Sequence, residues 1–577
     1  MNKILFQSIR EYKKESILAP VFVILEVFME VLIPMEMAKI IDIGIARGNL
    51  PYILQRGVIL VAMAFIALLF GVIAGKMAAT AGAGYAKNLR HDIFYKVQEF
   101  SFKNIDKFAT SGLVTRMTTD ITNVQMAYMM SIRLLARAPI MMILSWVMTL
   151  MINVKIALLF LIVVPLLGGT LVFIAKKAHP HFIKVFDEYD VLNNSVQENV
   201  NAARVVKAFV REDYEVEKFH GISKFVYTLF TKAEKIVAWN SPVMQFTMYT
   251  VVLIMISIGG NSIVSGSMAT GELTSVIVYA MQILMSLMMV TFVFVMLMIA
   301  EASTDRITEV LTEVPEMKDK EDAIKEVASG EIVFENVNFS YAGEGGNLSL
   351  KDINLHIKSG QTIGIIGGTG SAKSTLVQMI PRLYDVTSGS VKVGGIDVRE
   401  YNLEALRDQV SMVLQKNVLF SGTIYENIRW GDENASDEEV QRVCKLAQAD
   451  GFIQEFPAGY DTMIVQGGNN VSGGQKQRLC IARALLKKPK ILILDDSTSA
   501  VDTKTDALIR KAFREEIPNT TKIIIAQRIS SIEDADQIIV LDEGHVVGVG
   551  TSEELLKTNA IYREVYESQV KGGGEDE

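Results

Sequence analysis

The sequence has little cysteine and little charge. Only two of its 577 residues are cysteines, Cys444 and Cys480, which excludes a disulfide-bonded scaffold and predicts a reducing compartment. Charged residues make up 21% of the chain and hydrophobic residues 50%, a composition that excludes disordered, collagen-like and coiled-coil proteins. The N-terminal stretch lacks the apolar core of a cleavable signal, so we expect an amphipathic helix on a membrane surface there.

The charges are unevenly distributed along the chain. Residues 1–325 carry 31 Lys and Arg against 28 Asp and Glu, a net charge of +3. The remainder carries 57 − 31 = 26 against 65 − 28 = 37, a net charge of −11. An acidic second half repels phosphate backbones, so nucleic acid is not expected as a partner.

Six apolar stretches in the first half are long enough to cross a bilayer, whose core takes about 20 helical residues. Five of them carry no charged residue: 57–75, 138–154, 156–175, 241–271 and 273–300. The sixth, 16–35, contains Glu26 and Glu30, which lie on one helical face at this spacing. These carboxylates either line a translocation cavity and favour cationic substrates, or pair with a buried partner or become protonated.

The two long connections between spans, 76–137 and 176–240, hold 9 and 10 Lys and Arg, whereas the short joints on the other side hold three, Arg47, Arg56 and Lys155. This bias predicts that both connections lie in the cytoplasm. Six spans then place both termini on the cytoplasmic side of a plasma (inner) membrane. We expect the connections to be long helices that extend past the membrane and turn back.

The second half alternates short β-branched segments with helical patterns, which predicts α/β construction. Within it, the segment 363–375, IGIIGGTGSAKST, places a glycine-rich loop between a strand and a helix. In such loops backbone N–H groups and a helix N-terminus converge on phosphate. The pattern G-x-x-x-x-G-K-[ST] matches at Gly367, Lys373 and Ser374, although Ala372 replaces the second glycine.

Two further motifs are ambiguous when each is taken alone. The segment 491–496, ILILDD, fits a buried strand that delivers Asp495 to a metal, and it also fits an ordinary strand end. The segment 471–478, VSGGQKQR, is a glycine-containing turn before a basic helix, or a plain helix start. Together with the glycine-rich loop 363–375, however, these two motifs resemble the nucleotide-binding domain of ABC transporters. The resemblance is specific, because VSGGQ is characteristic of that superfamily.

With the six preceding spans, residues 1–570 resemble a half-transporter of the ABC exporter type. The resemblance implies an α-helical membrane domain of six transmembrane helices with long cytoplasmic extensions, and an α/β P-loop nucleotide-binding domain. The expected boundaries are 1–320 for the membrane domain, 321–330 for a linker, 331–570 for the nucleotide-binding domain and 571–577 for a disordered tail. ATP and Mg²⁺ are the implied cofactors, and a second half-transporter subunit and the lipid bilayer are the implied partners.

The resemblance also assigns roles to single residues. Tyr341 matches the aromatic residue that stacks on adenine, and Lys373 matches the lysine on the β- and γ-phosphates. Ser374, Gln415 and Asp495 match the residues beside Mg²⁺. The phosphate loop comprises Gly367, Gly368, Thr369, Gly370, Ser371, Ala372, Lys373, Ser374 and Thr375. The signature, which in this family closes on ATP held by the other subunit, comprises Ser472, Gly473, Gly474 and Gln475. Segments 499–502, 104–122 and 206–214 match the loop between the two sites and the two coupling helices.

Three departures from the family pattern concern catalysis. Asp496 replaces the usual glutamate that activates water, and Gln527 replaces the switch histidine. Aspartate is shorter by one methylene, about 1.5 Å, and an amide cannot carry positive charge. Ala372 adds a Cβ where the backbone approaches phosphate, and a disfavoured φ is expected there. Together these residues resemble the degenerate subunit of a heterodimeric multidrug-type exporter.

The resulting hypothesis is half of an ATP-driven pump that extrudes lipophilic or cationic compounds, such as drugs, lipids or peptides. The chain's own site would bind ATP and hydrolyse it poorly, and its signature would complete the competent site of the partner. Two alternatives remain open. One is a homodimer with two slow sites, and the other is a membrane protein gated by nucleotide that does not pump.

Overall fold

The computed structural model describes residues 3–343, 345–496 and 501–571. Contacts within the chain divide it into two compact units. The first comprises Met1–Glu99 and Phe108–Glu313, and the second comprises Phe100–Lys107 and Val314–Glu577. The expected tail, 571–577, lies outside the described residues except for Lys571.

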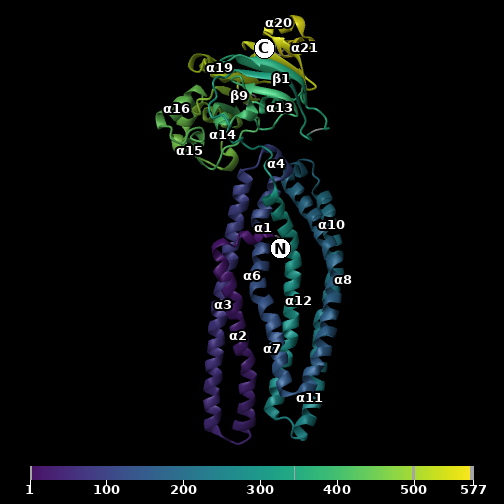
Figure 1. Cartoon of the computed structure of the whole chain (residues 1–577). Helices are drawn as coiled ribbons and strands as arrows, with labels where there is room; N and C mark the ends of the chain where they lie inside the picture. Colours follow the sequence, from purple (N-terminus) through teal and green to yellow (C-terminus); the bar gives the residue numbers. More distant parts are fainter. Residues whose placement is uncertain (1–2, 344, 497–500, 572–577) are drawn as a thin grey trace. The chain divides into compact units, whose positions relative to one another are not determined.

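The first unit consists of long helices that run side by side (Figure 1). Its α-helices are α1 (Lys3–Gln7), α2 (Lys13–Lys39), α3 (Leu50–Gln98), α5 (Thr110–Thr115), α6 (Ile121–Met130), α7 (Ala136–Ile152), α8 (Val154–Asn201), α9 (Ala203–Ala208), α10 (Glu212–Val237), α11 (Asn240–Val264) and α12 (Thr270–Thr312). Short helical segments of other types connect some of them: η1 (Arg10–Tyr12), η2 (Ile40–Ile45), η3 (Arg116–Asp120) and η4 (Ser131–Leu135).

Six of the described helical stretches are long and apolar enough to cross a membrane, which confirms the predicted number of spans. They are Arg10–Ile45, Leu50–Gln98, Thr110–Ile152, Val154–Val185, Glu212–Val264 and Thr270–Thr312. The turns between them are short where the sequence predicted short joints. Asn153 alone separates α7 from α8, and its side chain accepts hydrogen bonds from the backbone N–H groups of Lys155 and Ile156. This cap satisfies donors that the first turn of a helix leaves without partners.

Two carboxylates on π-helical segments fix α12 near its two ends. Asp42 of η2 accepts a hydrogen bond of 2.6 Å from the backbone N–H of Gly271. Asp120 of η3 is fully buried and accepts hydrogen bonds from Ser303 and from Arg306, at 2.9 and 2.8 Å. A buried carboxylate needs such partners, and π-turns are frequent where a helix must present one side chain off its regular face.

The second unit is an α/β domain. Its strands are β1 (Ile332–Phe339), β2 (Leu350–Ile357), β3 (Thr362–Gly367), β4 (Ser388–Val393), β5 (Ile396–Asp397), β6 (Val410–Val413), β7 (Gly422–Thr423), β8 (Met463–Ile464), β9 (Ile491–Asp495), β10 (Thr521–Ile525), β11 (Gln537–Asp542) and β12 (His545–Gly550). Its helices are α4 (Phe102–Lys107), α13 (Lys373–Gln378), η5 (Val398–Glu400), α14 (Leu403–Gln409), α15 (Ile424–Ile428), α16 (Asp437–Leu446), α17 (Asp450–Glu455), η6 (Gly459–Asp461), η7 (Gln466–Gly468), α18 (Gly473–Leu486), α19 (Thr503–Glu516), η8 (Ile529–Ser531), α20 (Ser552–Thr558) and α21 (Ala560–Lys571).

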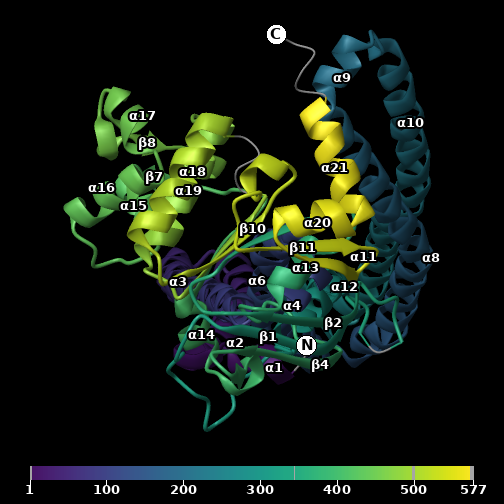
Figure 2. The ribbon, with the colours of Figure 1, turned by 90° about the horizontal axis from the view of Figure 1, so that it is seen from above.

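The larger sheet of this unit determines where a site can form. Its strand order is β12-β11-β3-β10-β9-β6, and β11, β3, β10, β9 and β6 are parallel. The strands β3, β9 and β10 are runs of buried aliphatic residues, as parallel strands covered on both faces require. Since parallel strands end at the same edge, the segments that follow β3, β9 and β10 meet there. The C-terminal helices α20 and α21 pack beside β12 and β3 (Figure 2).

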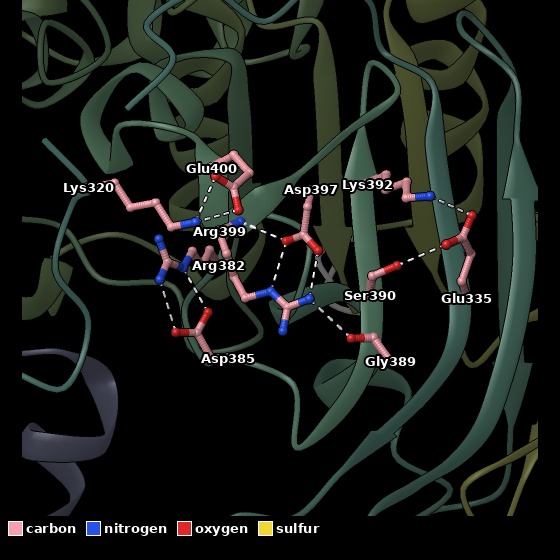
Figure 3. A network of polar contacts seen from close by, with 10 residues as sticks. All are labelled: Lys320, Glu335, Arg382, Asp385, Gly389, Ser390, Lys392, Asp397, Arg399 and Glu400. Atoms are coloured by element: carbon pink, nitrogen blue, oxygen red, sulfur yellow. Dashed lines mark hydrogen bonds and ion pairs between the residues drawn. The ribbon is translucent and has the colours of Figure 1, made fainter. Parts of the chain in front are cut away.

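The boundary between the units differs from the expected one. The second unit begins at Val314, and the expected linker is packed against the domain, because the N–H of Ile324 donates to the carbonyl of Glu400. Lys320 also forms an ion pair with Glu400 (Figure 3). Part of the first expected coupling segment, helix α4, belongs to this unit as well, where Lys103 pairs with Glu316 at 2.6 Å.

Candidate functional site

The phosphate loop connects the end of β3 to the start of α13, as the sequence predicted. Gly367 has no room for a side chain, because a Cβ there would lie 2.1 Å from the carbonyl oxygen of Leu541. Gly370 has a φ of +85°. Ala372 has a φ of 71°, in the left-handed region that favours glycine, so the expected disfavoured φ is present. The loop therefore has the required shape, with strain at the one position where alanine replaces glycine.

The ammonium of Lys373 lies over this loop. Its Nζ donates to the carbonyl oxygens of Gly367 and Gly368, at 2.9 and 2.8 Å. Burial lowers the pKa of Lys373, while the charges of Asp496 and Asp495 oppose this shift. A half-buried cation above a glycine-rich loop attracts an anion such as a phosphate.

Asp495 is the last residue of β9 and is 3% exposed. Its Oδ1 accepts a hydrogen bond of 2.9 Å from Ser374 Oγ. Burial raises the pKa of Asp495, and the neighbouring charge of Asp496 raises it further. A hydroxyl and a carboxylate held this close are oxygen ligands of the kind that Mg²⁺ prefers.

The residues present fit Mg²⁺ bound together with phosphates. Among the described residues, no group of three or more His, Cys, Asp or Glu side chains could hold a metal ion. Mg²⁺ typically takes one or two carboxylates from the protein and completes its shell with substrate phosphates and water. The pair Ser374 and Asp495 matches that requirement.

Asp496 and Gln527, the two residues that depart from the family pattern, are in direct contact. Gln527 Nε2 donates a hydrogen bond of 2.7 Å to Asp496 Oδ2, and Gln415 Nε2 lies 3.5 Å from the same oxygen. Burial raises the pKa of Asp496, and these two amide contacts oppose the shift. The backbone of Asp496 has a φ of 49°, in the left-handed region. Three residues singled out from separate motifs are thus brought together at one carboxylate.

Tyr341 lies two residues after β1, beside a cavity of about 300 Å³. Its hydroxyl lies 3.0 Å from Thr375 Oγ1, and its ring is exposed enough to stack on a ligand. The ring of Tyr384 meets that of Tyr341 edge-on, with centroids 5.2 Å apart, and its hydroxyl donates to Asp106 of α4 at 2.6 Å. The contact between Tyr384 and Asp106 was not predicted, since no spacing links residues 278 positions apart.

The signature residues begin helix α18. Ser472 is the N-cap: its Oγ accepts from the N–H of Gln475, while Gln475 Oε1 accepts from the N–H of Ser472. This capping box fixes the start of the helix and leaves the first turn accessible.

The remaining predicted segments are only partly described. Residues 497–500, which include Ser499 of the loop between the sites, lie outside the described residues. Asp502 caps α19 by accepting from the N–H of Thr505 at 2.9 Å. Helix α9 ends within the second expected coupling segment, where Phe209 and Val210 are strongly exposed.

In the first unit, Glu26 and Glu30 both bind Arg137. The closest N–O distances are 2.7 and 2.6 Å. The pairing alternative therefore describes this structure, and the role in a cavity stays a prediction. Arg137 lies one residue before an apolar stretch, at the start of a span, so the apolar pattern did not reveal it. One oxygen of Glu26 is buried without a hydrogen-bond partner among the described residues.

Comparisons with known proteins cover both the membrane unit and the α/β unit. The family model described as the ABC transporter transmembrane region matches residues 16–287, and the one described as ABC transporter matches residues 350–499. The ABC transporter ATP-binding protein YfiB of Bacillus subtilis is 38% identical over 568 residues, 98% of each chain.

Two further matches extend the comparison. The ATP-dependent lipid A-core flippase of Desulfotalea psychrophila is 34% identical over 489 residues, 85% of each chain. The solved structure of a bacterial Atm1-family ABC exporter with ATP bound matches with a TM-score of 0.85 at 24% identity, covering 96% of this chain and 99% of the other. This last likeness shows the shared fold.

Proposed function

This chain belongs to the ABC transporter family, and we propose that it is one half of a heterodimeric exporter whose own ATP site is degenerate. In this family the ATP-binding domain couples ATP hydrolysis to transport across the membrane. The observation that carries the proposal is the contact between Asp496 and Gln527. The position of the usual base is occupied by a shorter carboxylate, and that carboxylate is held by an uncharged amide.

The geometry supports slow hydrolysis at this site. A general base must lie within about 2.6–3.2 Å of the proton that it takes, and Asp496 falls short of the usual glutamate by about 1.5 Å. Gln527 donates to Asp496, so the amide holds an oxygen that would otherwise orient water. Mg²⁺, when bound, would neutralise phosphate charge next to Ser374 and Asp495. The chain thus retains the groups for binding ATP and weakens those for cleaving it.

The signature supports the second part of the proposal. Ser472 and Gln475 form an intact capping box at the start of α18, which is 14 residues long. The N–H groups and the dipole at this helix N-terminus favour a bound anion. We infer that this surface completes the competent site of the partner subunit. The catalytic residues are altered while the signature is kept, which is the expected pattern for a subunit that assists a different site.

We propose lipophilic or cationic compounds as substrates, with Glu26, Glu30 and Arg137 near their path. Ionisable side chains within a span are rare and often mark the path of a substrate. One relative is described as a flippase of lipid A-core, which supports an amphipathic substrate. The proposed location is the plasma (inner) membrane, with the nucleotide-binding domain and both termini in the cytoplasm.

One experiment separates the proposal from its two alternatives. The chain is purified alone and with the product of a neighbouring half-transporter gene, and ATPase and transport are measured in liposomes. Activity that requires the neighbour supports the heterodimer. Activity of the chain alone would indicate a homodimer with slow sites. Tight ATP binding without turnover in either preparation would indicate a nucleotide-gated protein that does not pump.

A further inference from the structure

The C-terminal helix α21 contacts the loop that carries Gln527. The side chain of Gln569, in the last turn of α21, forms two hydrogen bonds to the backbone of this loop. Its Oε1 accepts from the N–H of Ile529 at 2.8 Å, and its Nε2 donates to the carbonyl of Gln527 at 2.8 Å. One amide thus pairs with the backbone on both sides of Arg528, as a neighbouring strand would.

The loop is anchored elsewhere by contacts that do not reach residue 527. Before it, the N–H of Ala526 donates to the carbonyl of Ile365 in β3. After it, Ser531 Oγ donates to Asp506 at 3.0 Å. Gln527 itself is exposed, its amide donates to Asp496, and Gln569 holds its backbone carbonyl. The backbone position from which the Gln527 side chain extends therefore depends on the end of α21.

Helix α21 is itself well anchored. Tyr562, two turns before Gln569, is fully buried, and its hydroxyl lies 2.8 Å from Ser552 Oγ of α20. The N–H of Tyr562 also donates to Asn559 Oδ1. A helix fixed at its start can hold a side chain in its last turn against the loop.

We propose that Gln569 is a positioning residue that aims the amide of Gln527 at the γ-phosphate of ATP and so sets the preference of this site for ATP over ADP. The inference rests on the proposed function, in which residue 527 occupies the position that contacts the γ-phosphate. The physical basis is that two hydrogen bonds to a backbone fix where its Cα lies, and a short side chain cannot compensate for a displaced Cα. ADP lacks the γ-phosphate, so its binding does not depend on this contact.

The test uses the full chain in lipid nanodiscs and a photoreactive, non-hydrolysable ATP analogue that labels this chain. Imidodiphosphate ATP and ADP compete for the label. In Gln569→Ala the competition by the triphosphate should weaken by roughly three- to tenfold, as expected for the loss of one hydrogen bond, while competition by ADP stays unchanged. Gln569→Glu should show the same loss, because its carboxylate still accepts from Ile529 but repels the carbonyl of Gln527.

The matched control is Ser568→Ala, since the hydroxyl of Ser568 bonds within its own helix, to the carbonyl of Val565. This variant should keep the wild-type ratio of affinities. In a Gln527→Ala background, Gln569→Ala should change the ratio no further, because both substitutions act on one contact.

Two results would overturn the inference. One is an unchanged ratio in Gln569→Ala with the protein folded, and the other is an equal loss of affinity for both nucleotides, which would mean a purely structural role. Failure of the proposed function looks different. If Gln527→Ala alone leaves the ratio of ATP to ADP affinity unchanged, residue 527 does not contact the γ-phosphate. ATPase activity of the chain alone would instead refute the degenerate site, and it would leave this affinity ratio unchanged.

Discussion

The side-chain amide of Gln527 donates a hydrogen bond of 2.7 Å to the carboxylate of Asp496. Both residues replace the usual catalytic pair of the family, and the structure joins them. The hydrogen bond favours the charged form of Asp496, whereas burial raises the pKa of that carboxyl. We therefore expect Asp496 and Gln527 to act as one unit.

The purified chain alone should hydrolyse ATP well below the usual enzymatic range of about 1–10³ s⁻¹. The reason is that the carboxylate of Asp496 does not reach as far toward the attacking water as the usual glutamate, and that it accepts a hydrogen bond from Gln527. Phosphate release is measured with the chain in nanodiscs, and a Lys373→Ala variant gives the background rate. A solo rate within the usual range would contradict the degenerate site.

Lys373→Ala should weaken nucleotide binding at this chain's site and leave the partner's site loaded, because the ammonium supplies a point charge to phosphate. Burial lowers the pKa of Lys373, so its proton is lost at lower pH than the ordinary value of about 10.4. Wild-type affinity should thus fall as pH rises, starting below that value, whereas the Ala variant should lack this decline. Photoaffinity labelling of each subunit across pH measures both effects, and equal labelling of wild type and variant would count against the role.

Asp496→Glu alone should not create a fully active second site. The added methylene restores reach, but Gln527 remains an uncharged amide and Ala372 keeps its strained φ of 71°. Catalytic groups that act as a unit are not repaired one at a time. Single-turnover counting in the heterodimer measures the number of competent sites, with the combined Asp496→Glu and Gln527→His variant for comparison. Two equivalent sites after the single change would show that the defect is not compound.

Gly474→Asp in this chain should abolish ATPase activity of the heterodimer, whereas Asp496→Asn should lower it much less. Gly474 lies in the first turn of α18, where a bulky anion would block the approach of a phosphate bound by the partner. Both variants are paired with an unmodified partner and assayed side by side. If Asp496→Asn proves the more damaging, this chain holds the main catalytic site and the assignment of the two sites is reversed.

Arg137→Met should destabilise the membrane unit by roughly 3–5 kcal/mol, because it leaves two carboxylates in a span without their counter-charge. Removing the carboxylates as well, by Glu26→Gln and Glu30→Gln, should recover most of this loss. Thermal unfolding in detergent compares the single and the triple variant. A single variant as stable as wild type would mean that the triad is hydrated and contributes little.

The sequence by itself determined the two kinds of domain, the six spans and the phosphate loop. Each of these depends on a pattern within about 20 consecutive residues: the length of an apolar helix, or a strand, a glycine-rich loop and a helix in succession. Such patterns are local, so they can be recognised in the sequence without knowledge of the fold. The disfavoured φ at Ala372 was predictable for the same reason, since a glycine position in a known loop shape implies a backbone conformation.

Only the tertiary structure decided which distant residues meet. Arg137 reaches two carboxylates from another helix, Tyr384 reaches Asp106 across 278 positions, and Gln569 reaches the loop of Gln527 from the final helix. These pairings depend on how helices and strands pack. A hydrogen bond of about 3 Å between two distant residues cannot be inferred from their separation in the sequence. The sequence thus indicated the chemistry of the site, and the packing selected the partners that hold its side chains in place.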